Sequence, residues 1–178
     1  MRNTRANAEQ DSHGASGEGD YIVDDIDQIY GGSGNDNITG NALDNVIRGN
    51  AGDDTLNGLG GADTITGDSL TNGADLIYGG VGDDVLDGAG GNDTIYGESG
   101  GDVMKGGAGS DLLYGGDGDD QMYGGDGADS LFGQAGVDTL YDKDDANSSD
   151  SYADYLDGGA NNDVLGKSGT GDTVVSIP

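Results

Sequence analysis

Acidic and amide side chains recur along most of the chain at a spacing of nine residues. They are Asp27, Asp36, Asn45, Asp54, Asp63, Asp75, Asp84, Asp93, Asp102, Asp111, Asp120, Asp129, Asp138, Asp154, Asp163 and Asp172. Each follows a glycine-rich stretch and stands two positions before a lone aliphatic residue. Calcium prefers carboxylate and carbonyl oxygens, in shells of about six to eight. The pattern therefore predicts calcium binding by acids and turn carbonyls together.

Composition supports this chemistry and excludes others. The chain carries 35 acidic and 6 basic residues, a net charge of −29, and glutamate occurs only at Glu9, Glu18 and Glu98. With no cysteine and one histidine, His13, it lacks the ligands that zinc or copper would need. The scattered basic residues form no patch for nucleic acid. Low hydrophobicity with high charge predicts an unfolded chain unless a ligand compensates.

The repeat unit itself predicts the fold. One copy reads Gly31-Gly32-Ser33-Gly34-Asn35-Asp36-Asn37-Ile38-Thr39. Glycine at the first and fourth positions permits a sharp turn, and the last three residues suit a very short strand. Two units complete a coil of 18 residues, so we expect an all-β, right-handed parallel β-roll of about eight coils. Its core would be a line of aliphatic side chains: Ile29, Ile38, Ile47, Leu56, Ile65, Ile77, Leu86, Ile95, Met104, Leu113, Met122, Leu131, Leu140, Leu156, Leu165 and Val174.

The repeat also sets the domain boundaries. Residues 1–19 are predicted to be a disordered polar tail, and residues 20–178 the roll. Longer gaps mark insertions at residues 67–73 and 142–153. The second is rich in acids and amides, and it fits either a solvated loop or an extra calcium site. No apolar segment approaches the length of a signal peptide core or a membrane span.

The unit Gly-Gly-x-Gly-x-Asp-x-aliphatic-x resembles the RTX, or haemolysin-type, calcium-binding repeat. The resemblance implies calcium held between the turns of successive coils, by the sixth-position side chains enumerated above. It also implies ligation by backbone carbonyls of the turns that begin at Gly31, Gly49, Gly79, Gly106, Gly115 and Gly124. Two columns of turns allow at most about fourteen ions. Sites should be weak or absent where Asn45 replaces aspartate, or where Leu43 and Asn161 replace the fourth-position glycine.

Aromatic residues form a second periodic feature. Tyr78, Tyr96, Tyr114 and Phe132 occupy the ninth position of alternate repeats, and Tyr123 and Tyr141 start a shorter series on the opposite face. We expect the first four to form an outward-facing ladder. One interpretation is a platform for a polysaccharide or a cell-surface partner, as in the accessory modules of alginate epimerases. The other is that the rings stabilise neighbouring strands by stacking.

These observations favour an extracellular module that folds as it binds several Ca²⁺ ions, with no nucleic-acid partner. Catalysis is not expected, because no set of nucleophile, base and orienting residue exists. The Gly-x-Ser-x-Gly match at Gly97–Gly101 lies inside a predicted calcium turn. Besides polysaccharide binding, ice binding is a further alternative. The varied seventh positions, such as Asn37, Thr55 and Leu76, count against it.

Overall fold

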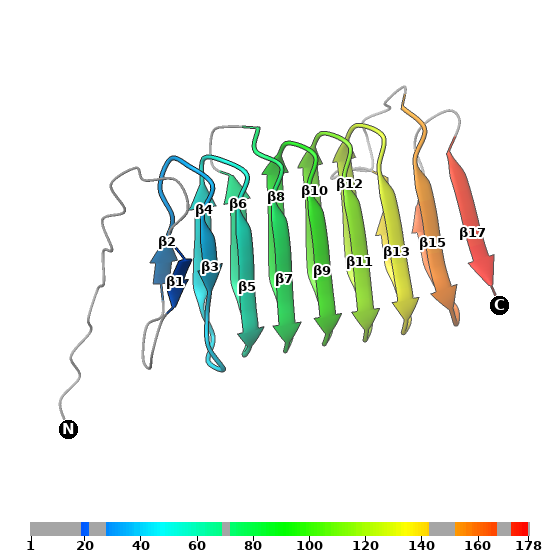
Figure 1. The fold of residues 1–178 in the computed structure, drawn as a ribbon. Coiled ribbons are helices and arrows are strands. Elements are labelled where there is room, and N and C mark those ends of the chain that lie inside the picture. Colours follow the sequence, from blue (N-terminus) through cyan, green and yellow to red (C-terminus); the bar gives the residue numbers. More distant parts are fainter. Residues whose placement is uncertain (1–18, 22–27, 69–71, 143–151, 167–171, 178) are drawn as a thin grey trace.

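Two parallel β-sheets make up the fold. The computed structural model describes residues 19–21, 28–68, 72–142, 152–166 and 172–177, and the regular elements in these ranges are all strands (Figure 1). Of the predicted tail, residues 1–19, the first 18 lie outside the described residues, and Gly19 belongs to the first strand. No helix in the described ranges is long and apolar enough to cross a membrane.

Odd-numbered strands form one sheet and even-numbered strands form the other. The nine-stranded sheet contains β1 (Gly19–Tyr21), β3 (Asn37–Thr39), β5 (Thr55–Gly60), β7 (Leu76–Val81), β9 (Thr94–Ser99), β11 (Leu112–Asp117), β13 (Ser130–Ala135), β15 (Tyr155–Ala160) and β17 (Thr173–Ile177). The eight-stranded sheet contains β2 (Gln28–Tyr30), β4 (Val46–Asn50), β6 (Thr64–Asp68), β8 (Val85–Gly90), β10 (Val103–Ala108), β12 (Gln121–Asp126), β14 (Thr139–Tyr141) and β16 (Val164–Gly166).

Neighbouring strands pair in parallel with identical repeat positions side by side. Ile95 of β9 pairs with Leu113 of β11, and Leu113 pairs with Leu131 of β13. The chain therefore alternates between the sheets and returns to the same sheet after 18 residues in the regular coils and after 21 or 25 where an insertion lies between. The strands lie side by side along a rod, which confirms the predicted parallel β-roll (Figure 1).

The core is the single line of aliphatic side chains between the sheets. In β9 the middle residue Ile95 is fully buried, while Thr94 and Tyr96 on either side are half-buried, as the alternation of a strand requires. The core is Ile29, Ile38, Ile47, Leu56, Ile65, Ile77, Leu86, Ile95, Met104, Leu113, Met122, Leu131, Leu140 and Leu156.

Two predicted core residues differ. Leu165 is only partly buried against the core, and Val174 is 38% exposed. Val174 lies on β17, the last strand of its sheet, so a neighbouring strand covers it from one side only. The sequence pattern predicted the repeat position of these two residues correctly, but the prediction that their side chains are buried was wrong.

Both insertions leave the register of the roll intact. Leu56 pairs with Ile77 across the first insertion, and Leu131 pairs with Leu156 across the second. Residues 69–71 and 143–151 within them lie outside the described ranges. The extra residues therefore enlarge two turns while the coils before and after them stay in register.

Glycine at the fourth position of the unit is required by the close stacking of turns. Gly118 has φ of 138°, and a Cβ added there would collide with the carbonyl group of Gly100 in the preceding coil. Other residues rarely adopt this conformation. Asn161, which replaces glycine at this position, has φ of 105° and is therefore strained.

A core substitution should measure how much the line of aliphatic side chains contributes to the free energy of unfolding. We expect Leu113→Ala to lower the free energy of unfolding by about 2–5 kcal/mol, because the narrow core cannot close the cavity. Leu59→Ala removes the same atoms from a side chain that is 45% exposed, and should change stability by less than about 0.5 kcal/mol. Denaturant unfolding in saturating calcium would compare the two. Equal effects would contradict a core confined to this line.

Candidate metal sites

The periodic acids form two columns, one along each row of turns. The first column is Asp36, Asp54, Asp75, Asp93, Asp111, Asp129, Asp154 and Asp172, and the second is Asn45, Asp63, Asp84, Asp102, Asp120, Asp138 and Asp163. Asp27, predicted to begin the second column, lies outside the described residues. Most of these side chains are buried, with exposed fractions of 0–3%. The structure therefore places acidic groups in the least exposed part of each turn.

One carboxylate oxygen of each aspartate is held by the backbone of the preceding coil. The N–H of Asp93 donates to Oδ1 of Asp111 at 2.8 Å, and the N–H of Asp102 donates to Oδ1 of Asp120 at 2.9 Å. The same bond recurs across the insertions, from Asp54 to Asp75 and from Asp129 to Asp154. The backbone carbonyl of each position also accepts the N–H of the seventh residue one coil later, as Asp93 does from Leu112 at 2.9 Å.

The other carboxylate oxygen is buried and accepts no hydrogen bond. This holds for Oδ2 of Asp54, Asp63, Asp75, Asp84, Asp93, Asp102, Asp111, Asp120, Asp138, Asp163 and Asp172. Buried polar atoms in proteins are nearly always paired, and an unpaired buried oxygen costs free energy. A column of such oxygens therefore points to a ligand that binds them.

Burial also makes the charged form of these acids unfavourable. It raises the pKa of Asp75, Asp93 and Asp120 from 3.8 to about 7. It raises the pKa of Asp54, Asp63, Asp102 and Asp111 to about 6, and that of Asp84 and Asp138 in the same direction. The backbone N–H on Oδ1 opposes the shift, and for most of these groups neighbouring carboxylates add to it. A positive charge beside Oδ2 would offset both burial and the repulsion between carboxylates, the two causes that raise the pKa.

The first-position glycines leave room beside these oxygens. A Cβ added to Gly79 would lie 2.5 Å from Oδ2 of Asp84 and 2.9 Å from the carbonyl oxygen of Gly97 in the next coil. Among the predicted carbonyl ligands, Gly49, Gly79, Gly106, Gly115 and Gly124 present their oxygens in this way to the preceding coil's first glycine. The carbonyl of Gly31 instead accepts from Nδ2 of Asn50 at 3.3 Å.

The oxygen atoms of these turns fit calcium as ligands. Gaps between regular turns, such as that between Asp84 and Asp102, offer a carboxylate oxygen without a hydrogen bond, a second carboxylate one coil away and backbone carbonyls, all hard oxygen ligands. A family model, the RTX calcium-binding nonapeptide repeat, matches residues 21–42, 39–69, 70–104, 96–131, 105–140 and 149–165.

The chain belongs to the RTX calcium-binding repeat family. Its repeats form a calcium-binding β-roll, as the sequence predicted. A comparison with curated proteins gave no match. The individual ligands and the number of ions remain predictions, and they rest on the geometry of each turn.

Two turns at the N-terminal end already bind the corresponding side-chain oxygen within the turn, although only the Asn45 turn departs from the RTX consensus. Asn45 accepts the N–H of Asn41 at 2.8 Å through Oδ1. Oδ2 of Asp36 accepts the N–H of Gly32 at 2.6 Å. In both turns the oxygen that is left without a donor in later RTX units is already bonded, so we expect weak calcium sites there.

Two acids at the insertions were not among the individually predicted ligands, although an extra calcium site in the second insertion was one of the two interpretations of its sequence. Asp68 and Asp142 are buried, and each stands at the start of a turn where the RTX unit has glycine. Carboxylate oxygens of Asp142, Asp154 and Asp172 lie within 4.8 Å of one another. The signal was present in the sequence, because Asp142 directly follows the ninth-position residue Tyr141.

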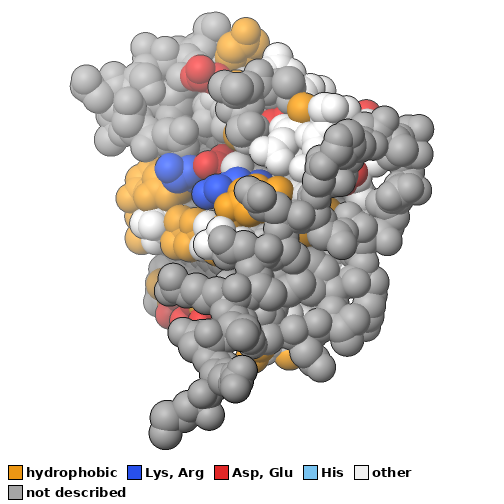
Figure 2. Space-filling view, turned by 90° about the vertical axis from the view of Figure 1, so that its left-hand side faces the viewer, with side chains coloured by type: hydrophobic (Ala, Val, Ile, Leu, Met, Phe, Trp, Pro, Cys, Tyr) orange, Lys and Arg blue, Asp and Glu red, His pale blue; other side chains and the backbone are white. Residues whose placement is uncertain are grey.

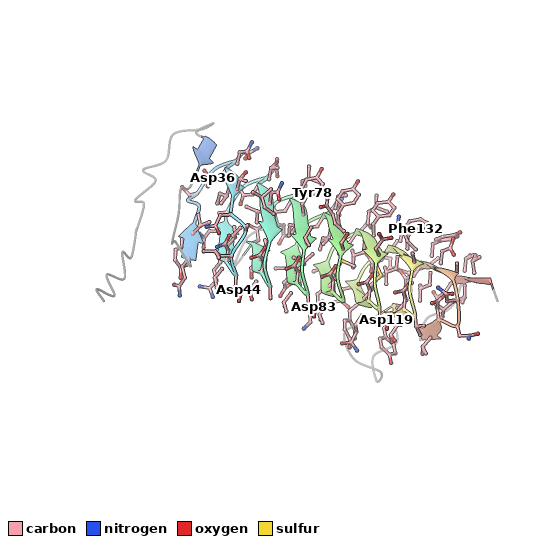
Figure 3. The ribbon with its side chains drawn as sticks, turned by 90° about the horizontal axis from the view of Figure 1, so that it is seen from below. Asp36, Asp44, Tyr78, Asp83, Asp119 and Phe132 are labelled. Atoms are coloured by element: carbon pink, nitrogen blue, oxygen red, sulfur yellow. The ribbon has the colours of Figure 1, made fainter. Side chains whose placement is uncertain are left out.

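The aromatic ladder forms as predicted. Ring centroids of Tyr78, Tyr96, Tyr114 and Phe132 are 5.0–5.1 Å apart, with interplanar angles of 7–15°. Tyr123 and Tyr141 stack on the opposite face, 5.3 Å apart. Seen from below, Tyr78 and Phe132 lie on one long edge of the roll, and Asp83 and Asp119 on the other (Figure 3). Each inner ring covers the faces of its neighbours, so mainly ring edges and hydroxyls face outward.

One substitution separates column acids from other acids. Asp84→Asn should lower the calcium stoichiometry by one or two ions and raise the calcium concentration needed for folding, because it removes a carboxylate between two turns. Asp83→Asn is the matched control. Asp83 is exposed, and its Oδ1 accepts the N–H of Gly101 at 2.9 Å, a bond that an asparagine, Asn92, makes to Ser110 at 2.8 Å. Titration calorimetry would compare them, and equal losses would argue against column ligation.

The raised pKa values predict a pH effect on the metal-free chain. The folded roll keeps protons that the unfolded chain releases near its ordinary pKa of 3.8. The resulting stabilisation is complete below pH 3.8 and is lost as pH rises through about 6–7. Acidification from pH 7.5 to 5 in chelator should therefore increase the β signal in circular dichroism. In saturating calcium the signal should stay constant, and a metal-free signal that stays flat or falls would refute the sign.

Proposed function

We propose that this chain is an extracellular module that folds when it binds several calcium ions. The buried Oδ2 atoms without hydrogen bonds, repeated along both columns, carry the proposal. They have the same environment in coil after coil, as expected for a ligand that binds in every gap. RTX repeats bind calcium, and the step beyond that finding is that binding drives folding.

Electrostatics makes calcium necessary for folding. Strands in a sheet are about 4.8 Å apart, and two unit charges about 5 Å apart repel by about 3 kcal/mol at an effective dielectric of 20. Each column repeats this repulsion along its length. The opposing core contains one aliphatic side chain per strand. A divalent ion in each gap would turn the repulsion into attraction and would join adjacent coils.

Calcium-dependent folding fits a location outside the cell. Extracellular calcium modules bind with Kd values of about 0.1–1 mM, far above cytosolic calcium. The chain would then stay expanded where it is made and fold after export. RTX repeat proteins are typically secreted, which supports the same location.

The proposed role is binding rather than catalysis. The described acids of the two columns are committed to backbone bonds through Oδ1, and a carboxylate that also holds a metal is a poor general acid or base. The ladder supports a stabilising role, because its inner rings cover one another and offer no face to a sugar. The polysaccharide alternative remains a hypothesis that no observation favours.

A calcium titration followed by far-UV circular dichroism and small-angle X-ray scattering tests the proposal. We expect a cooperative gain of β signal and a change from an expanded chain to a rod, with no response to magnesium at matched ionic strength. Magnesium demands near-ideal octahedral geometry and gives up its waters reluctantly, so these turns should reject it. A β-rich metal-free chain with a cooperative thermal transition at pH 7.5 would overturn the proposal.

A further inference from the structure

A small hollow lies beside the aromatic ladder. It has a volume of about 250 Å³ and is lined by Tyr96, Glu98, Tyr114, Gly115, Gly116, Asp117 and Gln134. These residues come from three adjacent strands of the nine-stranded sheet: β9, β11 and β13. Glu98, Asp117 and Gln134 are exposed, so the hollow opens to solvent, while Gly115 in its lining also lies beside Oδ2 of Asp120 in the second column.

The backbone keeps this hollow open. Glu98, Gly116 and Gln134 occupy the same position in successive coils, so the missing side chain of Gly116 leaves a space between the other two. Gly116 has φ of 121°, and a Cβ there would collide with the carbonyl oxygen of Glu98. No side chain at position 116 could therefore fill the space between Glu98 and Gln134.

The lining favours a single positively charged group. Two carboxylates, the Gln134 amide oxygen and two phenol oxygens offer acceptors around a space smaller than the roughly 300–1,000 Å³ of typical small-molecule pockets. An oligosaccharide would need more room and an open ring face, and Tyr96 and Tyr114 stack on each other at 5.0 Å. A guanidinium or ammonium group needs only acceptors and negative potential.

The described basic residues of this chain do not reach the hollow. Arg48 and Lys105 lie on β4 and β10 of the eight-stranded sheet, the other side of the roll. Arg48 lies over the ring of Tyr30, 5.5 Å from its centroid. Figure 2 views the roll from its N-terminal end and shows Lys and Arg side chains beside hydrophobic ones. Among the described residues, none therefore supplies a positive group to the hollow.

We propose that the hollow between Glu98 and Gln134 binds an arginine or lysine side chain of a partner polypeptide. The geometry places Glu98 on one side and Asp117 at the turn, with Tyr96 and Tyr114 as the wall. The net charge of −29 would steer such a partner toward this surface. The proposed charge contacts use Glu98 and Asp117, which are not column acids, whereas Gly115 in the lining is also a predicted calcium ligand. The site therefore requires that the roll be folded.

The test uses the full chain in saturating calcium and short peptides of the form acetyl-Gly-Gly-X-Gly-Gly-amide. X is arginine, lysine or citrulline, the neutral analogue of arginine. NMR chemical-shift titration of the amides of Gly115 and Gly116 reports on the hollow. We expect weak, saturable binding of the arginine and lysine peptides that falls with added salt, and no saturable binding of citrulline. Citrulline binding equal to that of arginine would overturn the proposal.

Variants separate the hollow from the general negative field. Glu98→Gln and Asp117→Asn should each weaken arginine-peptide binding about fivefold, the value of one exposed charge contact. Asp126→Asn is the matched control, because Tyr123-Gly124-Gly125-Asp126 repeats the sequence Tyr114-Gly115-Gly116-Asp117 on the opposite sheet. There Gly107 stands where Glu98 stands in the hollow. An equal loss in Asp126→Asn would show attraction by net charge only and would overturn the proposal.

Two further titrations distinguish the source of the positive group. Spermidine carries ammonium groups without a polypeptide, and a neutral cello-oligosaccharide carries hydroxyls without charge. Binding of spermidine alone, with no response to either peptide, would refute a polypeptide partner. Saturable sugar binding that is lost in Glu98→Gln would refute the positive group. Circular dichroism of each variant in calcium would show that the roll is folded, so loss of folding and loss of binding are distinguishable.

Discussion

The carboxylates of the two columns are the constraint on which the rest of the roll depends. In the regular coils an aspartate accepts a backbone N–H from the preceding coil on Oδ1, as Asp111 does from Asp93, and its Oδ2 is buried beside the first glycine of its own turn. The first bond ties adjacent coils together, and the second oxygen is a predicted calcium ligand. Glycines, short strands and a thin core all follow from turns that must approach this closely.

This constraint explains where the sequence varies and where it does not. Insertions are accommodated between the start of the turn and the column aspartate, and the bond across them persists, from Asp54 to Asp75 and from Asp129 to Asp154. Outward positions vary freely among Thr, Leu, Ser and Tyr because they contact only their neighbours in the sheet. The ladder and the hollow at Gly116 both arise from this freedom.

Most of the fold was predictable because each nine-residue unit repeats the same local information. Register, strand positions and the core line through Leu113 follow from the period alone. The burial of Val174 was not predictable, since it depends on what lies beside β17. The site was predictable as far as the columns. Asp142 was not among the individually predicted ligands because it replaces the first glycine of a unit, although an extra calcium site in that insertion was one interpretation. The hollow was missed because it depends on Gly116 lying between two longer side chains in neighbouring coils.

The direction of the hydrogen bonds has a mechanical consequence. The strands run across the rod, so the bonds between coils, such as Leu112 N–H to the Asp93 carbonyl, point along its axis. A force pulling the two ends apart would load one interface at a time and peel off single coils, instead of shearing a whole sheet at once. Each coil of 18 residues would release about 60 Å of extended chain. The roll would then yield in many small steps and act as an extensible spacer.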